Sequence, residues 1–402
     1  MKQKFQKIKL KNGITILFEK RDIPVVSFSI SNPFAAAHET ADIKGIAHFI
    51  EHLLFTGTKT RTHEDISREI EKKGGVLNAF TAQDVTSYWF KLPSEHLFSG
   101  IDILVDMLKN PKFDKEKFEK EKKVILEEIK MYHDNPQRHV FEKIEENLYE
   151  KPFGLGISGS EKTIKPLTRD FVANYFKTKY SPENYIITIV GNADIDKVSQ
   201  YIENQFKPEN KTYKHQKIKT KHAETVEERP GLDQAHFVFA VHAPMATDKK
   251  RYVLEVLDAY LANGMSSHLF LEIREKRGLA YAVKSSLSAE KNYSYYNIYV
   301  GTTKEAVPKV RELIIQGFKH ASEKITEKDL KEAKQRLIGL KEIMSEESSN
   351  IMNVLLMEEI STGKAEDFYN YEQEIKKVTL REVKQLSKEL IKTFSTASIV
   401  PK

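Results

Sequence analysis

The 402-residue chain contains no cysteine. This absence excludes disulfides, thiolate metal ligands and cysteine catalysis, so a metal site would have to be built from histidine and carboxylate side chains. The chain also lacks any run of 18 apolar residues, and a transmembrane helix is therefore not expected. The N-terminus is basic but has no apolar segment of the kind found in secretory signals, which favours a cytoplasmic location.

The charge is not dominated by one sign. The 64 basic and 58 acidic residues are interspersed and leave a formal net charge of +6. No basic motif interleaved with aromatic residues is present, so we interpret the surplus as a solvated surface and expect neither nucleic acid nor a membrane as a partner. The length is too great for one ordinary core, and two or more domains are expected.

Short strand patterns alternate with long amphipathic helix patterns, which indicates an α+β or α/β protein. The first half predicts strands at 14–18 and 25–30, a helix at about 43–56, a hairpin of 76–81 and 86–92, and helices at about 94–109 and 115–133. The second half predicts a strand at 235–242, helices at 249–262 and 266–276, strands at 280–288 and 292–300, and helices at 304–321, 327–346 and 350–361. This broadly similar order predicts two domains of one fold, 1–207 and 231–402. The polar, lysine-rich segment 208–230 between them predicts a linker.

The pentapeptide His48-Phe-Ile-Glu51-His52 lies on the helix predicted at about 43–56. Histidines four positions apart project about 40° from each other on one helix face, so both imidazoles can reach one metal ion. Glu51 lies on the same side. The flanking sequence is apolar, as in a buried helix, where three ionisable side chains need a partner. A zinc ion with an activated water would satisfy all three. The alternative is a buried histidine pair hydrogen-bonded to the carboxylate.

Zinc held by two histidines needs a third protein ligand if water is to occupy the fourth position. On the helix predicted at 115–133, Glu121 and Glu128 share one stripe with apolar residues such as Ile125, whereas Glu127 lies to the side. Periodicity thus directs Glu128 inward, with Glu121 in line behind it. The alternative is that both glutamates belong to a solvated surface paired with lysines.

His48-x-x-Glu51-His52, followed by Glu128 76 positions after His52, is similar to the inverted-motif zinc peptidases of the pitrilysin family. That family includes insulin-degrading enzyme and the mitochondrial processing peptidase. The resemblance extends over both halves of the chain, through 45–58, 78–81, 135–136, 180–184, 264–270 and 274–281. The chain is as short as the two-domain bacterial processing-type members. It departs from the family at His268, where arginine is usual.

The resemblance implies two homologous domains, each an antiparallel-rich mixed sheet packed with several helices, that face each other across a cavity. It also implies one zinc ion per chain, bound by His48, His52 and Glu128. Glu51 would be the general base toward a zinc-activated water, and Glu121 would support the site from behind the ligands.

The resemblance also implies a set of substrate contacts. Asn78, Ala79 and Thr81 would belong to an edge strand that pairs with an extended peptide by β-addition. Arg274 and Tyr281 match the family's arginine/tyrosine pair, in which the tyrosine hydroxyl would donate to the tetrahedral oxyanion and the arginine would hold substrate carbonyls. Without the resemblance, they would be interpreted as an ordinary helix arginine and strand tyrosine. The four-domain members take this pair from their last domain, so a two-domain chain is expected to complete its site as a homodimer.

The expected function is that of a zinc metalloendopeptidase that hydrolyses short or unfolded peptides in an enclosed chamber. One alternative is a non-catalytic structural subunit, like the respiratory-complex core proteins that share this fold, but the complete set of motif residues favours catalysis. A second alternative is an active chain that works as half of a heterodimer. Another divalent ion is compatible with the same ligands.

Overall fold

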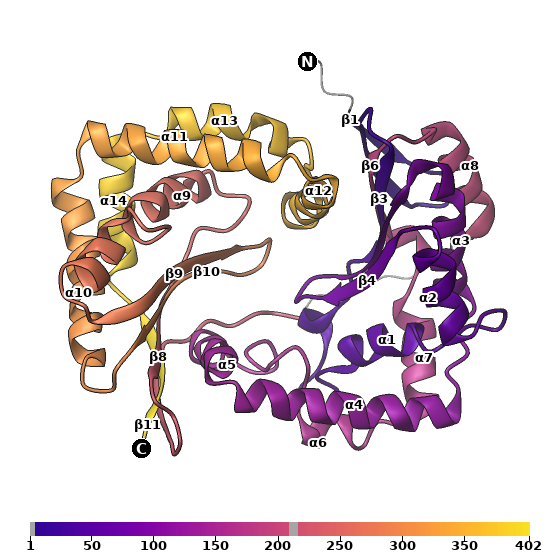
Figure 1. Cartoon of the computed structure of the whole chain (residues 1–402), viewed down its shortest axis with the longest axis horizontal. Helices are drawn as coiled ribbons and strands as arrows, with labels where there is room; N and C mark the ends of the chain where they lie inside the picture. Colours follow the sequence, from indigo (N-terminus) through magenta and orange to yellow (C-terminus); the bar gives the residue numbers. More distant parts are fainter. Residues whose placement is uncertain (1–4, 209–215) are drawn as a thin grey trace. The chain divides into compact units, whose positions relative to one another are not determined.

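The computed structural model describes residues 5–208 and 216–402 (Figure 1). The chain divides into two compact units. The first unit consists of Met1–Lys130, Leu155–Lys217 and Met344–Glu366, and the second consists of Met131–Gly154, Ile218–Ile343 and Asp367–Lys402. Each unit contains one mixed sheet packed with helices, which confirms the predicted α+β class. The units are not continuous in sequence, because 131–154 and 344–366 each join the unit formed mainly by the other half of the chain.

The sheet of the first unit has six strands in the order β1-β2-β6-β3-β5-β4. They are β1 (Phe5–Lys9), β2 (Thr15–Lys20), β3 (Val25–Asn32), β4 (Val76–Thr81), β5 (Thr86–Pro93) and β6 (Ile186–Gly191). Among these strands of the described residues, only β2 and β6 pair in parallel. β1 and β2 form a hairpin around Asn12-Gly13, with Gly13 at a φ of +90°, and the predicted hairpin of β4 and β5 is confirmed. The last strand of the sheet at one edge is β4.

The first unit also contains helices, some of which pack directly against this sheet. They are η1 (Ala36–His38), α1 (Ile46–Leu54), α2 (His63–Glu71), η2 (Ser94–His96), α3 (Leu97–Lys109), most of α4 (Lys115–Asp134), α6 (Glu161–Ile164), α7 (Arg169–Lys179), η3 (Pro182–Asn184), α8 (Ile195–Gln205) and α12 (Ser348–Thr362). A capping box of Thr62 and Asp65 opens α2. Phe49 and Leu53 of α1 are buried in one core with Phe118 and Ile125 of α4. This shared core fixes the two helices that carry the predicted ligands.

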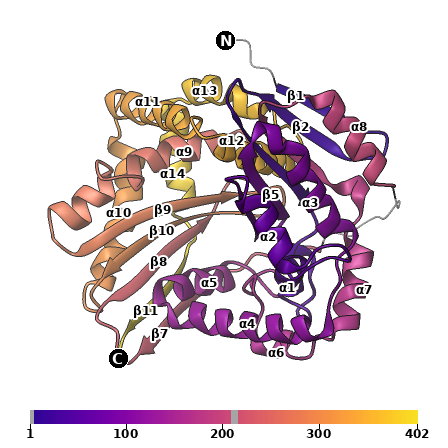
Figure 2. The same ribbon diagram turned by 45° about the vertical axis from the view of Figure 1, so that its right-hand side comes forward.

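The sheet of the second unit has the order β7-β11-β8-β10-β9. Its strands are β7 (Glu224–Arg229), β8 (Ala235–His242), β9 (Ala280–Ala289), β10 (Ser294–Thr302) and β11 (Ser395–Pro401). Figure 2 shows β8, β9 and β10 side by side. An element not expected from the sequence is β7, which lies within the segment 208–230. It carries almost no apolar residues and is held by parallel pairing with β11. Residues 209–215 of the predicted linker lie outside the described residues.

The helices of the second unit are α5 (Pro136–Leu148), α9 (Lys250–Leu261), the π-helix η4 (Phe270–Glu275), α10 (Val307–Lys324), nearly all of α11 (Glu327–Met344), α13 (Asp367–Lys377) and α14 (Leu380–Leu390). The helix predicted at 266–276 is thus a short π-helix, and the last two helices were not expected from the sequence. Within the described ranges, none of the helices has the length and apolar character needed to cross a membrane.

Candidate metal and catalytic site

Helix α1 is anchored at its N-terminus by a buried carboxylate. Glu39 accepts hydrogen bonds from the backbone N–H groups of Gly45 (2.9 Å) and Ala47 (2.7 Å), which would otherwise lack partners at the start of a helix. Burial raises the pKa of Glu39, although the nearby charge of Lys44 and the two N–H bonds act in the opposite direction. Gly45 has a φ of +99°, and a Cβ there would lie 2.6 Å from the carbonyl oxygen of Ser158. This segment therefore fixes where α1 begins and which face it presents.

His48, His52 and Glu128 bring three donor atoms together. The two imidazole rings lie edge to face with centroids 4.8 Å apart. The Nε2 atoms of His48 and His52 lie 3.7 Å and 3.5 Å from Oε2 of Glu128, and one ligand atom from each residue lies within 4.8 Å of the others. Donors placed about 2.0–2.1 Å from a tetrahedral zinc ion are roughly 3.3 Å apart. These separations are too long for hydrogen bonds but close to that edge length, so the three side chains fit a zinc ion.

The two neighbouring glutamates of α4 lie in different surroundings. Oε2 of Glu121 lies 3.5 Å from Nδ1 of His52, on the side of the ring opposite Glu128. A carboxylate in that position fixes the orientation of a histidine ligand. Glu127 is exposed and forms an ion pair with Lys130 at 2.7 Å. The structure thus places Glu128 and Glu121 against the histidines and leaves Glu127 at the surface.

The two histidines differ electrostatically. Burial, together with the charge of His52, lowers the pKa of His48 to about 4, so that its imidazole is neutral at pH 7. Burial also acts to lower the pKa of His52, but the contact with Glu121 and the charges of Glu128 and Glu51 outweigh it, and the pKa is raised. The carboxylates thus surround His52 with negative charge that a bound cation would neutralise.

Glu51 is held by a residue of the neighbouring strand. The hydroxyl of Thr81, on β4, donates a hydrogen bond of 2.5 Å to Oε2 of Glu51. Burial raises the pKa of Glu51, while the Thr81 bond and the charge of His52 lower it in part. The sequence suggested Thr81 only as part of a substrate-binding strand, and its contact with Glu51 depends on how β4 packs against α1.

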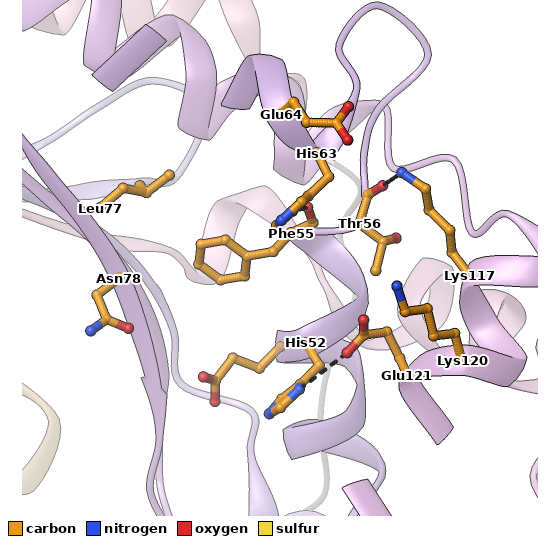
Figure 3. Close-up of a pocket in the computed structure, with 11 residues that line it drawn as sticks. His52, Phe55, Thr56, His63, Glu64, Leu77, Asn78, Lys117, Lys120 and Glu121 are labelled. Carbon is orange, nitrogen blue, oxygen red and sulfur yellow. Dashed lines mark hydrogen bonds and ion pairs between the residues drawn. The ribbon is translucent and has the colours of Figure 1, made fainter. Parts of the chain in front are cut away.

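A cavity of about 540 Å³ adjoins His52 and Glu121, as Figure 3 shows. It is lined from α1, the segment after it, α2, β4 and α4 by Glu51, His52, Phe55, Thr56, His63, Glu64, Leu77, Asn78, Lys117, Lys120 and Glu121. In the described part of the chain, no strand pairs with the outer edge of β4. The backbone N–H of Ala79 donates instead to Oδ1 of Asn78 at 2.8 Å. An extended peptide could therefore reach this strand edge beside the histidines.

Arg274 and Tyr281 belong to the second unit, whereas the other predicted site residues belong to the first. The guanidinium of Arg274, on η4, lies over the ring of Phe270 at 4.9 Å. Tyr281, near the start of β9, is 47% exposed, and its hydroxyl lies 3.2 Å from that of Tyr299.

Two family models match the chain. Residues 28–161 match the family described as Insulinase (Peptidase family M16), and residues 166–337 match the Peptidase M16 inactive domain. A protein of Bacillus subtilis named uncharacterized zinc protease YmxG is 30% identical over 396 residues, which cover 97% of each chain. The chain belongs to the M16 peptidase family. This finding confirms the resemblance stated from the sequence.

Other relatives of this M16 chain agree with the assignment. A protein of Rickettsia bellii named uncharacterized zinc protease is 31% identical over 344 residues, covering 84% of this chain and 83% of the relative. The solved structure of a protease from Helicobacter pylori superposes with a TM-score of 0.93 at 20% identity, covering 99% of this chain and 100% of the other. A Pseudomonas fluorescens structure described as a peptidase M16 inactive domain gives 0.90 at 18% identity, covering 99% and 98%. Because these two structures are only 20% and 18% identical in sequence to this chain, they show that the fold is shared and nothing more.

A second group of possible donors lies in the second unit and consists of His133, His139 and Glu227. The positively charged side chain of Arg229 already lies among these three residues. Arg229 donates from Nε to Oε1 of Glu227 at 2.5 Å, and its terminal nitrogen lies 3.2 Å from Nε2 of His133. The guanidinium of Arg229 contacts both Glu227 and His133, and its positive charge would repel a metal ion. We therefore interpret this group as a self-contained ionic network.

Proposed function

We propose that this M16 chain is a zinc-dependent endopeptidase that hydrolyses short or unfolded peptides. The observation that carries the proposal is the approach of His48 and His52 to Glu128 at 3.5–3.7 Å, with Glu51 beside them. Curated relatives are named zinc proteases, which supports the same chemistry. The enclosed chamber expected from the resemblance stays a prediction.

His48, His52 and Glu128 would hold the metal, and a zinc ion bound there supplies a Lewis acid at the reacting centre. Glu51 takes a proton from the water that attacks the peptide carbonyl carbon, and then passes that proton to the leaving amine. Its burial supports this role, because a raised pKa brings a carboxylate closer to the pH at which it must both accept and release a proton. Thr81 holds one carboxylate oxygen, Oε2, which leaves the other for the water.

The substrate would bind as an additional strand along β4. Asn78 would release the N–H of Ala79 to a substrate carbonyl, and the peptide backbone would supply most of the recognition. Broad specificity follows, because backbone pairing reads extended shape more than side-chain identity.

By analogy with the four-domain members, we also infer a homodimer in which Arg274 and Tyr281 of a second copy complete the site. In that arrangement Tyr281 donates a hydrogen bond to the carbonyl oxygen as it becomes negatively charged. Mixing Glu51→Gln and Tyr281→Phe chains should restore part of the activity, because one of the two sites in the mixed dimer carries both intact residues. Absence of any rescue would contradict the shared site.

The deciding experiment combines metal analysis with hydrolysis of an internally quenched peptide. We expect about one zinc ion per chain, as for a site with three protein ligands. Cleavage should be abolished by a chelator and restored by zinc. Glu51→Gln should retain the metal but lose activity, because it removes the base and none of the ligands. Zinc-loaded protein that cleaves no peptide would instead support a structural or partner subunit, and full activity of Glu51→Gln would refute the assigned base.

A further inference from the structure

The ring of Tyr281 packs on the backbone of Gly301, at a position where only glycine leaves enough room. Along β9 and β10 the register passes from Gly301 opposite Ala282 to Thr302 opposite Ala280, so Tyr281 is the extra residue of a β-bulge. Its ring folds over Gly301. A Cβ at that position would lie 2.3 Å from Cζ and 2.4 Å from the hydroxyl oxygen of Tyr281. The tyrosine therefore rests on bare backbone of β10.

The hydroxyl of Tyr281 is the outer end of a hydrogen-bonded chain across three neighbouring strands. It lies 3.2 Å from the hydroxyl of Tyr299 on β10, which lies 2.9 Å from Nδ1 of His236 on β8. His236 is opposite Gly301 in the β8–β10 register, so it shares a sheet face with Tyr299, two residues from Gly301. Tyr299 is 1% exposed and packs against the ring of Phe141 on α5 at 5.7 Å. Tyr299 is thus fixed by packing, His236 is half-buried, and Tyr281 is the most exposed of the three side chains.

The donors and acceptors in this series of hydrogen bonds can be arranged in two directions. In the outward direction, Nδ1–H of His236 donates to Tyr299, Tyr299 donates to Tyr281, and the proton of Tyr281 remains for an outside acceptor. In the inward direction, Tyr281 donates to Tyr299, Tyr299 donates to His236, and the lone pairs of Tyr281 face outward. Because burial lowers the pKa of His236, its ring is neutral at pH 7, and the tautomer selects the direction.

We propose that Tyr299 and His236 are positioning residues that hold these hydrogen bonds in the outward direction, so that the proton of Tyr281 points at the carbonyl oxygen of the substrate. The inference rests on the proposed function, which gives Tyr281 its role. An oxyanion would be repelled by the lone pairs of the inward arrangement and attracted by the proton of the outward one. A hydroxyl that accepts a hydrogen bond is also a stronger donor, so the chain strengthens the contact to the oxyanion.

Kinetics of single and double variants test the coupling. Tyr281→Phe removes an oxyanion donor and should lower kcat by about 100-fold or more. Tyr299→Phe keeps the ring and removes the hydroxyl, and should lower kcat by about tenfold with KM unchanged. The double variant should be no slower than Tyr281→Phe, because Tyr299 acts only through Tyr281. Losses that multiply would overturn the positioning role.

His236 offers a matched pair of substitutions. Asparagine places its amide nitrogen where Nδ1 of the histidine lies, whereas glutamine reaches to the position of Nε2. We therefore expect His236→Asn to retain most of kcat and His236→Gln to lose as much as Tyr299→Phe. Equal activity of the two variants would contradict an atom-specific contact.

The direction can be read without any catalysis. In protein with 3-fluorotyrosine at position 281, the ¹⁹F resonance reports ionisation of this one phenol across a pH titration. If Tyr299 donates to residue 281, it stabilises the phenolate, and Tyr299→Phe should move the midpoint to higher pH. A midpoint that falls or stays unchanged would overturn the outward direction.

These results separate the inference from the proposed function. If wild-type protein cleaves no peptide, or if Tyr281→Phe leaves kcat unchanged, the proposed role of Tyr281 fails while the ¹⁹F titration still reports the direction of the chain. If Tyr281→Phe is impaired but Tyr299→Phe is not, the role of Tyr281 stands and the positioning role fails alone.

Discussion

Gly301→Ala should separate activity from stability. The new Cβ would lie 2.3–2.4 Å from three atoms of the Tyr281 side chain, whereas carbon atoms in contact are about 3.5 Å apart, so the ring must retreat by roughly 1 Å. Tyr281 is 47% exposed and can move toward solvent without opening a cavity. The free energy of unfolding should therefore fall by about 1 kcal/mol or less. A displacement of about 1 Å at a catalytic contact can cost about 100-fold in rate, and we expect kcat to fall by that order.

Gly339→Ala is the matched control. Gly339 lies within α11 of the same unit, and apart from the backbone of its own helix no atom of the described residues lies within 4 Å of its ideal Cβ position. Alanine there should leave kcat unchanged and stabilise the helix by up to about 1 kcal/mol. The measurements are steady-state hydrolysis of the quenched peptide and urea unfolding for both variants. Unchanged kcat for Gly301→Ala, or a loss of kcat fully explained by unfolded protein, would refute the idea that the packing of Tyr281 on Gly301 positions its hydroxyl.

Three further predictions concern the first unit. Glu128→Gln should lower zinc occupancy in dialysed protein, whereas Glu127→Gln, which breaks only a surface ion pair with Lys130, should bind zinc like the wild type; equal occupancy in the two variants would contradict the ligand assignment. Ala79→Pro removes an N–H from the edge of β4 without requiring a change in the sheet and should raise KM, so an unchanged KM would argue against β-addition. Asp106 is buried, and hydrogen bonds from four partners hold its pKa below the ordinary value despite burial. Asp106→Asn should lower the free energy of unfolding by about 1–3 kcal/mol at pH 7, and the difference from wild type should shrink below pH 4 as the wild-type carboxylate becomes protonated. A difference that is independent of pH would contradict this account.

The sequence predicted those parts of the site that depend on local geometry. The helical repeat alone placed His48 and His52 on one face and distinguished Glu128 from Glu127, because neighbours along a helix are fixed by 3.6 residues per turn. Hairpins around Asn12-Gly13 and between β4 and β5 were also predictable from turn residues and strand patterns. In each case the signal lies within a few residues of the feature that it predicts.

Features that depend on distant segments gave no such signal. Glu39 caps α1 from a separate turn, and nothing in its own neighbourhood marks it as a helix cap. β7 has no apolar repeat and is a strand only because β11, from the far end of the chain, supplies its hydrogen-bonding partner. Similarly, 131–154 and 344–366 join the units that their contacts determine, and sequence position alone does not reveal this.

The same distinction explains why the surroundings of Tyr281 are invisible in the sequence although Tyr281 itself is not. Metal ligands on one helix must keep a fixed spacing, so they form a motif. Tyr299 and His236 lie on two other strands. The strand order together with a bulge brings Tyr299 next to Tyr281 and His236 next to Tyr299. Any loop length between those strands would give the same contact. Residues that position a catalytic group should therefore be sought across the sheet from it. Gly301→Ala is the most direct test, because the three atoms nearest to a methyl group there all belong to Tyr281.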